Sequence, residues 1–359
     1  MGRVYNFSAG PSILADEVLI ELKKDLFNYK GTGMSVMEMS HRSGIYLEIF
    51  EDAKNCLREL MDIPEDYEIF FSHGGATGQF AAIPLNLLKR KADYIITGSF
   101  SGKAAQEAEK YGKVHIAYDD EKKIYDTIPL QKELKLSEDA DYVHLCANNT
   151  IYGTQWQLFP DTGDIPLIAD MSSDILSRKI DVSKFSLIYA GAQKNMGIAG
   201  LSVVIIRKDL IEKCDPLTPS VFSYELSEKN DSMLNTPSTY SIYVMDKVLQ
   251  WLIRCGGIEE IQRRNTIKAS LLYDYLDSQD YYLAHACKKD RSMMNVTFTT
   301  PRKESDEEFV SLGTKRGLLN LKGHRLVGGI RASIYNAMPL EGVRELVNFM
   351  EDFRLEKCK

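Results

Sequence analysis

The chain has 359 residues, of which 44% are hydrophobic and 26% charged, and its formal net charge is −7. This length allows two domains, and this composition is typical of an ordinary globular protein rather than a disordered or fibrous one. An acidic chain without a basic block argues against a nucleic-acid partner or an anionic membrane surface.

The first residues, MGRVYNFSAGPS, contain no apolar core of signal-peptide length, and no run of about 18 apolar residues occurs anywhere. We therefore expect a cytoplasmic protein. The six cysteines, at positions 56, 146, 214, 255, 287 and 358, form no CxxC pair and indicate reduced thiols. No cluster of histidine and cysteine has metal-ligand spacing, so we expect no metal.

The first two thirds of the chain predict a large α/β domain. Residues 12–29 and 44–61 have helical spacing, and helices at about 78–90 and 102–111 then alternate with strands. Such alternation favours a mainly parallel sheet covered by helices on both faces. Seven strands are predicted, at 67–72, 93–97, 113–118, 142–146, 165–169, 185–190 and 200–210.

The last third predicts a smaller α+β domain. Residues 236–278 are helical in character, with a break at Gly256 and Gly257. Strands at 294–300, 317–323 and 328–335 and helices at 304–316 and 340–353 follow. We place the boundary inside the helical region, which gives a large domain of residues 1–265 and a small domain of residues 266–359. We expect the N-terminal segment of the large domain to contribute to the substrate site and to the small domain.

The stretch IYAGAQKNMGIAG, residues 188–200, places a single lysine, Lys194, between two apolar segments. A lysine there needs a partner or a reason to lose its proton, and desolvated lysines are the ones used in Schiff-base chemistry. From this stretch alone, a loop lysine that extends to solvent is an equally good interpretation.

Unusual residues also follow other strands of the predicted sheet, where a doubly wound fold gathers its ligand contacts. A glycine-rich turn, HGGATG, precedes a helix and suits an anion, although it can equally just start that helix. Phe100 could stack on a planar ligand or lie in the core. Asn148, Asn149 and Thr150 could hold a ring substituent or form a plain turn, and Asp170 could pair with a cation or cap a helix.

Asp170 and Lys194 together favour a specific chemistry. Pyridoxal phosphate (PLP) is held by a lysine, pairs its ring nitrogen with an acidic residue and needs a cradle for its phosphate. The chain offers all three at strand ends. The lysine would serve as covalent anchor and then as the base that moves the substrate's Cα proton.

A second set of candidates is basic and lies in glycine-bordered segments. Arginine binds carboxylate and phosphate with two-point geometry, so this set indicates an anionic substrate with more than one charged end. Each member taken singly could also be a surface cation. The set consists of His41, Arg42, His324, Arg325 and Arg331.

With these residues in place, the chain resembles the phosphoserine aminotransferases, PLP enzymes of the fold-type I aminotransferase class. The resemblance spans nearly the whole length. It is carried by NFSAGPS (6–12), MSVMEMSHRS (34–43), GGATGQFAAIPLNLL (74–88), ADMSSDILSR (169–178), IYAGAQKN (188–195) and KGHRLVGGIRASIYNAMPLEGV (322–343).

The resemblance implies a role for each candidate. Lys194 would be the Schiff-base lysine, Asp170 the partner of the ring nitrogen, and Thr150 the partner of the phenolic oxygen. Ala76, Thr77 and Gln193 would bind the cofactor phosphate, joined by Asn235 and Thr236 of a second subunit, which implies a homodimer with active sites at its interface. Arg42 and Arg331 would bind the substrate carboxylate, and His41, His324 and Arg325 its phosphate.

The implied reaction is reversible amino transfer from glutamate to 3-phosphohydroxypyruvate in serine biosynthesis, with a further role in pyridoxine biosynthesis left open. Two positions depart from the family pattern: Phe100 replaces a stacking tryptophan, and Thr77 stands where some members carry an arginine. The alternatives are a fold-type I lyase or desulfurase and a non-catalytic PLP-fold protein. The absence of GxGxxG argues against a nicotinamide dehydrogenase.

Overall fold

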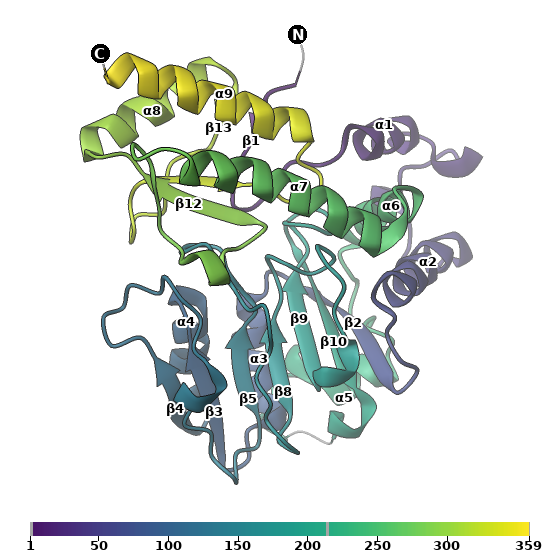
Figure 1. Ribbon diagram of the computed structural model, residues 1–359. Helices are drawn as coiled ribbons and strands as arrows, with labels where there is room; N and C mark the ends of the chain where they lie inside the picture. Colours follow the sequence, from purple (N-terminus) through teal and green to yellow (C-terminus); the bar gives the residue numbers. More distant parts are fainter. Residues whose placement is uncertain (1–2, 213–214, 359) are drawn as a thin grey trace.

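A seven-stranded sheet forms the centre of the computed structural model, which describes residues 3–212 and 215–358 (Figure 1). Its strand order is β2-β10-β9-β8-β5-β3-β4, and only β10 runs antiparallel to its neighbours. The predicted α/β fold with a mainly parallel sheet is therefore confirmed. The strands are β2 (Tyr67–His73), β3 (Lys91–Ile96), β4 (Lys113–Asp119), β5 (Val143–Cys146), β8 (Leu167–Asp170), β9 (Leu187–Gly191) and β10 (Leu201–Arg207).

The inner strands of the sheet are apolar and buried on both faces, as in LIYAG of β9 and LSVVIIR of β10, whereas the edge strand β4 is mostly half-buried or exposed. Alternate side chains point to two separate apolar clusters. One cluster includes residues of α1 (Asp16–Asp25), α2 (Gly44–Met61) and α6 (Thr239–Arg254). The other includes residues of α3 (Thr77–Leu87), α4 (Ser99–Ala108) and α5 (Tyr224–Lys229).

The C-terminal elements surround a third apolar cluster, at the top of Figure 1. There an antiparallel sheet of β11 (Leu283–Ala284), β12 (Asn295–Thr299) and β14 (Ile330–Ser333) packs with α7 (Gly257–Asp277), α8 (Lys303–Lys315) and α9 (Leu340–Lys357). The N-terminal segment joins this part, since β1 (Tyr5–Asn6) pairs with β13 (Leu318–Leu319). The boundary at 265/266 falls inside α7 and stays a prediction.

Two predicted elements are shorter than expected. The helix expected over 12–29 spans only Asp16–Asp25. It starts late because Ser12 instead bonds through its backbone N–H to the Gln193 carbonyl, at 2.9 Å, and Asn28 beyond its end has a non-helical φ of −152°. The strand expected over 317–323 is reduced to Leu318–Leu319 and pairs with β1, outside the three-stranded sheet. Positive φ angles at Gly317 and Asn320 interrupt the extended chain on both sides.

A buried lysine fixes the segment that follows β14. Lys268 of α7 is 2% exposed and donates to the carbonyls of Ile334, at 3.0 Å, and Tyr335, at 2.7 Å. Burial lowers the pKa of Lys268 to about 7. The backbone N–H of Asn336 in turn donates to Oδ1 of Asn195, at 3.1 Å. The segment after β14 is therefore hydrogen-bonded directly to Asn195, the residue next to Lys194.

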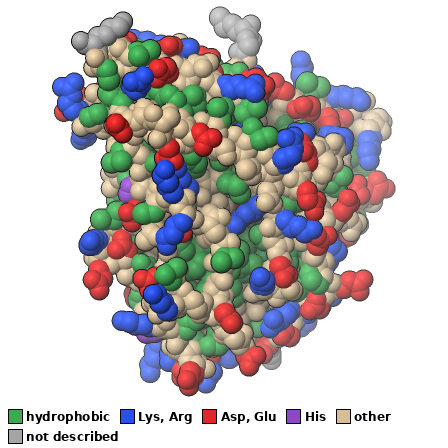
Figure 2. Space-filling model, in the orientation of Figure 1, with side chains coloured by type: hydrophobic (Ala, Val, Ile, Leu, Met, Phe, Trp, Pro, Cys, Tyr) green, Lys and Arg blue, Asp and Glu red, His purple; other side chains and the backbone are tan. Residues whose placement is uncertain are grey.

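Charged side chains of both signs are interspersed over the face seen in Figure 2. None of the helices within residues 3–212 and 215–358 is long and apolar enough to cross a bilayer. The same residues contain no group of three or more histidine, cysteine or acidic side chains placed to bind a metal ion. The cysteines at 56, 146, 255, 287 and 358 carry free thiols, and Cys214 lies outside the described residues.

Candidate active site

Lys194 lies in the turn between β9 and β10, at the carboxyl end of β9. Its ammonium group donates to Oγ1 of Thr150, at 2.8 Å, and lies 5.8 Å from the ring centroid of Phe100. Thr150 follows the short strand β6 (Asn148–Asn149), and Phe100 lies in the first turn of α4. Two candidates from separate parts of the sequence, Thr150 and Phe100, thus lie beside the Lys194 nitrogen.

Asp170 ends β8, the strand next to β9, and is 5% exposed. Burial raises the pKa of its carboxyl group, opposed by hydrogen bonds from Ser172 and by the charge of Lys194. The backbone N–H of Ser172 donates to Oδ1, at 2.9 Å. An ionised carboxylate at this depth is costly unless a cation is bound beside it. Asp170 is therefore suited to pair with a positively charged ligand group.

The N-terminal segment crosses the Lys194 turn through Ser12, a residue that the sequence did not single out. The Ser12 hydroxyl donates to the Lys194 carbonyl, while its backbone N–H bonds Gln193. Gly10, with φ of +143°, provides a conformation that side chains rarely adopt. The motif NFSAGPS carries the resemblance, but it contains nothing that points to a lysine more than 180 residues away.

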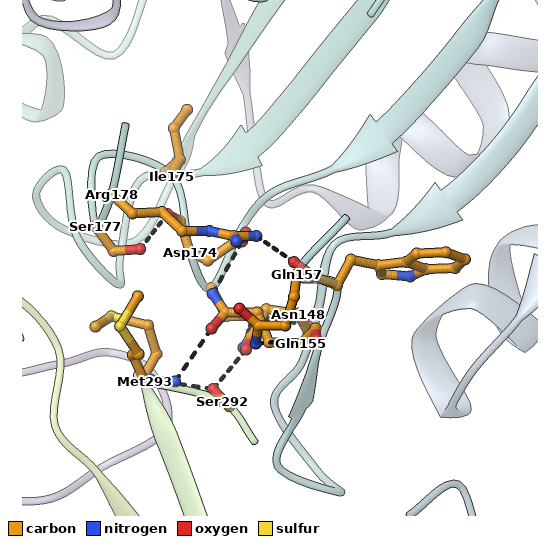
Figure 3. A network of polar contacts seen from close by, with 12 residues as sticks. Asn148, Gln155, Gln157, Asp174, Ile175, Ser177, Arg178, Ser292 and Met293 are labelled. Carbon is orange, nitrogen blue, oxygen red and sulfur yellow. Dashed lines mark hydrogen bonds and ion pairs between the residues drawn. The ribbon is translucent and has the colours of Figure 1, made fainter. Parts of the chain in front are cut away.

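A polar network holds the Asn148 turn in place (Figure 3). Asn148 donates to the Ser173 hydroxyl at 2.8 Å and accepts from Ser292 at 2.5 Å. Gln155 donates to the buried carboxylate of Asp174, at 3.2 Å. Because these contacts join the turn to the chain after Asp170 and to the chain before β12, they fix Thr150 relative to Lys194.

A group of cations lies beside this centre. Nη1 of Arg331 donates to the Thr150 carbonyl, at 3.3 Å. The pKa of His324 is lowered by burial and then by the charges of Arg331, Arg325 and Lys103. Lys103 is absent from the sequence candidates. Within the described chain, no ion pair with a carboxylate neutralises Lys103, Arg325 or Arg331.

A cavity of about 810 Å³ lies elsewhere, between α1, α7 and the start of α9. Its arginines are already neutralised. Arg3 pairs with Asp16, and Arg263 and Arg264 both pair with Glu260. The unneutralised cations near Lys194 are therefore the better candidates for binding an anionic substrate.

The predicted phosphate site follows β2. Ala76 and Thr77 start α3, whose first turn has no side-chain cap. No described hydrogen bond uses the backbone N–H groups of Ala76 and Thr77, which can therefore bind an anion, whereas those of Gly78 and Gln79 donate to carbonyls. Oε1 of Gln193, next to Lys194, is buried and has no hydrogen-bond partner among the described residues. Such orphaned groups are rare in proteins and indicate a missing partner.

Four candidates are not brought to Lys194 by the single chain. Asn235 and Thr236 are exposed before α6, and the Thr236 carbonyl bonds His73, at 2.8 Å. Arg42 is exposed, and His41 keeps a buried Nε2 without a described partner. No described hydrogen bond or ion pair joins these four residues to Lys194.

The residues present fit PLP. Lys194 has a free ammonium group beside a hydroxyl and an aromatic ring. Asp170 is a buried carboxylate that needs a cation, which a protonated ring nitrogen would supply. The start of α3 offers backbone N–H groups, and the side-chain amide of Gln193 offers its Nε2 N–H donors, for the oxygens of a phosphate.

A family model and individual sequence relatives both place the chain among the aminotransferases. Residues 4–346 match the family model described as Aminotransferase class-V. The chain is 53% identical to a phosphoserine aminotransferase of Bacillus cereus, over 99% of both chains. It is 50% identical to one of Nitrosomonas europaea, over 98% of this chain and 99% of the other.

Solved structures agree with the sequence relatives. The fold matches phosphoserine aminotransferase from Bacillus circulans subsp. alkalophilus with a TM-score of 0.97 and 46% identity, over 99% of both chains. A PLP-bound phosphoserine aminotransferase from Trichomonas vaginalis matches with a TM-score of 0.93 and 39% identity, over 97% of this chain and all of the other.

Proposed function

The chain belongs to the class-V aminotransferase family, and on that premise we propose that it transfers the amino group of L-glutamate reversibly to 3-phosphohydroxypyruvate. The products are O-phospho-L-serine and 2-oxoglutarate, a step of serine biosynthesis, and the cofactor is PLP. The observation that carries the proposal is the set of unneutralised cations around Lys194. They suit substrates with an anionic group at each end.

PLP, when bound, supplies an electron-accepting ring that stabilises the negative charge left when a Cα proton is removed. Lys194 would hold the cofactor covalently through Nζ. Once displaced by the amino substrate, the same Nζ amine would accept the Cα proton of the substrate as a general base. The Thr150 hydroxyl, which already contacts Nζ, keeps this amine oriented.

Asp170 would hold a proton on the ring nitrogen through its carboxylate. The hydrogen bond from Ser172 holds the carboxylate in place, and burial keeps water away from it. Attraction between the carboxylate and a protonated ring nitrogen is stronger in such a site than in water. The Phe100 ring would cover one side of the site by stacking. Ala76, Thr77 and Gln193 are the phosphate-binding candidates of this subunit.

Substrate binding is assigned to the basic set. Arg331, held by the Thr150 carbonyl, and Arg42 would bind the carboxylate next to the reacting carbon. His324, Arg325 and His41 would bind the distal phosphate. The distal group of glutamate carries about one negative charge, whereas a phosphate carries roughly −1.5 to −2.

Arg325→Ala should therefore discriminate between the two substrates. We expect kcat/KM for 3-phosphohydroxypyruvate to fall by about 10- to 100-fold, and that for glutamate by less than about threefold. Steady-state assays of both substrates provide the measurement, with Arg344→Ala in α9 as the exposed control. Equal losses for both substrates would refute a dedicated phosphate contact.

A homodimer is part of the proposal. Several apolar side chains within residues 20–47 are exposed, among them Phe27 at 83%, and exposed apolar side chains gathered in one part of a chain favour an interface there. Helix α6, which follows Asn235 and Thr236, packs against α1 and α2 of this same region. A partner seated there would explain why His41, Arg42, Asn235 and Thr236 are exposed or lack partners.

Mixing two inactive variants tests this arrangement. If Asn235 and Thr236 act across the interface, Lys194→Ala subunits combined with Asn235→Ala/Thr236→Ala subunits form one intact site per mixed dimer. After exchange of subunits we expect roughly a quarter of the wild-type activity. Activity no higher than the sum of the two separate variants would contradict the shared site.

A cytoplasmic location and a second role in pyridoxine biosynthesis extend the proposal. The free thiols, including the buried Cys146, are compatible with a reducing compartment. Cell fractionation tests the location, and an assay with the phosphorylated hydroxythreonine derivative tests the second role.

A further inference from the structure

Lys103 lies one helical turn after Phe100 on α4, on the same side of the helix. Its ammonium group lies 5.5 Å from the Phe100 ring centroid, and the Lys194 ammonium lies 5.8 Å from the same centroid. One aromatic ring thus links the exposed Lys103 to the centre of the candidate site. A solvated surface lysine is the ordinary alternative.

The surroundings of Lys103 argue against that alternative. His324 and Arg325 belong to the loop between β13 and β14, and Val327 of this loop packs on the same apolar cluster as Phe100. Lys103 is close enough to His324 for its charge to oppose protonation of the imidazole. The loop and α4 therefore present cations to the same space from two different elements.

These cations repel one another, and no described carboxylate pairs with Lys103 or Arg325. By contrast, the next lysine along the chain after α4, Lys110, is neutralised by Glu107, at 2.6 Å. Gathering unneutralised cations costs energy unless an anion binds among them. A doubly charged anion would offset the repulsion among these cations more than a singly charged anion.

We propose that Lys103 is a specificity-determining residue that binds the distal phosphate of the substrate together with Arg325 and His324. This inference rests on the proposed function, because it takes the phosphorylated keto acid as the substrate. Burial and neighbouring cations lower the pKa of His324, so near neutral pH this imidazole contributes mainly a hydrogen bond. The charge must then come from Lys103 and Arg325, and a lysine suits phosphate as a mobile point charge.

The test compares Lys103→Ala, Lys103→Arg and the matched control Lys110→Ala. In Lys103→Ala, we expect KM for 3-phosphohydroxypyruvate to rise about 10- to 50-fold with kcat changed less than about threefold. KM for glutamate should rise less than about threefold. Lys103→Arg should restore most of the loss because it keeps the charge, and Lys110→Ala should resemble the wild type.

Binding of inorganic phosphate to the PLP-loaded enzyme, measured by calorimetric titration, gives a readout without turnover. It should weaken in Lys103→Ala by a similar factor and stay unchanged in Lys110→Ala. Equal changes for both substrates, or phosphate binding unchanged in Lys103→Ala, would overturn the inference. Failure of the proposed function itself would appear separately, as a wild-type enzyme that does not aminate 3-phosphohydroxypyruvate.

Discussion

Lys194→Ala should lower kcat by at least about 1,000-fold, since it removes the amine that we propose as both the covalent anchor and the base that moves the Cα proton. The variant should fold normally, because the Lys194 side chain makes one described hydrogen bond, to Thr150, and its backbone contact with Ser12 is kept. Single-turnover measurements with glutamate at saturating PLP provide the test.

Lys315→Ala, which changes an exposed lysine near the end of α8, is the matched control and should keep wild-type activity. Circular dichroism should give the same spectrum and melting temperature for the wild type and both variants. A Lys194→Ala enzyme with full turnover would refute the assignment of this lysine.

Asp170→Asn should lower kcat by at least about 100-fold, the second largest effect that we expect. The amide has the shape of the carboxyl group and can keep the bond from Ser172, but it provides no charge to hold a proton on the ring nitrogen. PLP should also bind more weakly, which equilibrium dialysis measures independently of turnover.

The pH dependence of this site has a definite sign. Burial raises the pKa of Asp170, so in the free protein the negative charge that we propose to pair with the cofactor is lost at a higher pH than for an ordinary aspartate. PLP affinity of the wild type should therefore fall as pH decreases through this raised value, and Asp170→Asn should lose that dependence. Asp164→Asn, at an exposed position, serves as control. An unchanged rate in Asp170→Asn would remove this residue from the mechanism.

The strands of the central sheet could be predicted because each is an apolar run of fitting length, bounded by turns, as LIYAG of β9 illustrates. The pairing of β1 with β13 could not, since more than 300 residues separate Tyr5 from Leu318 and neither segment carries a local signal for the other. The helix expected at 12–29 was too long for a similar reason: a contact with Gln193 holds its first residues extended.

Some residues of the candidate site could be predicted from the sequence and others could not. Asp170 and Lys194 were identifiable because each is a single charge at the end of an apolar strand. Ser12 and Lys103 were not identifiable, because a serine in a loop and a lysine on a helix are common in any sequence. Only the structure shows that Ser12 contacts Lys194 and that Lys103 lies near His324. The roles of His41, Arg42, Asn235 and Thr236 stay predictions that follow from the resemblance.

The most direct test of the central claim is the visible absorption spectrum of the purified PLP-loaded protein, recorded before and after each substrate. The account predicts a yellow cofactor band that glutamate bleaches and that 3-phosphohydroxypyruvate restores, while Lys194→Ala shows no such cycle. A wild-type protein that stays colourless with added PLP, or whose band neither substrate changes, would contradict it.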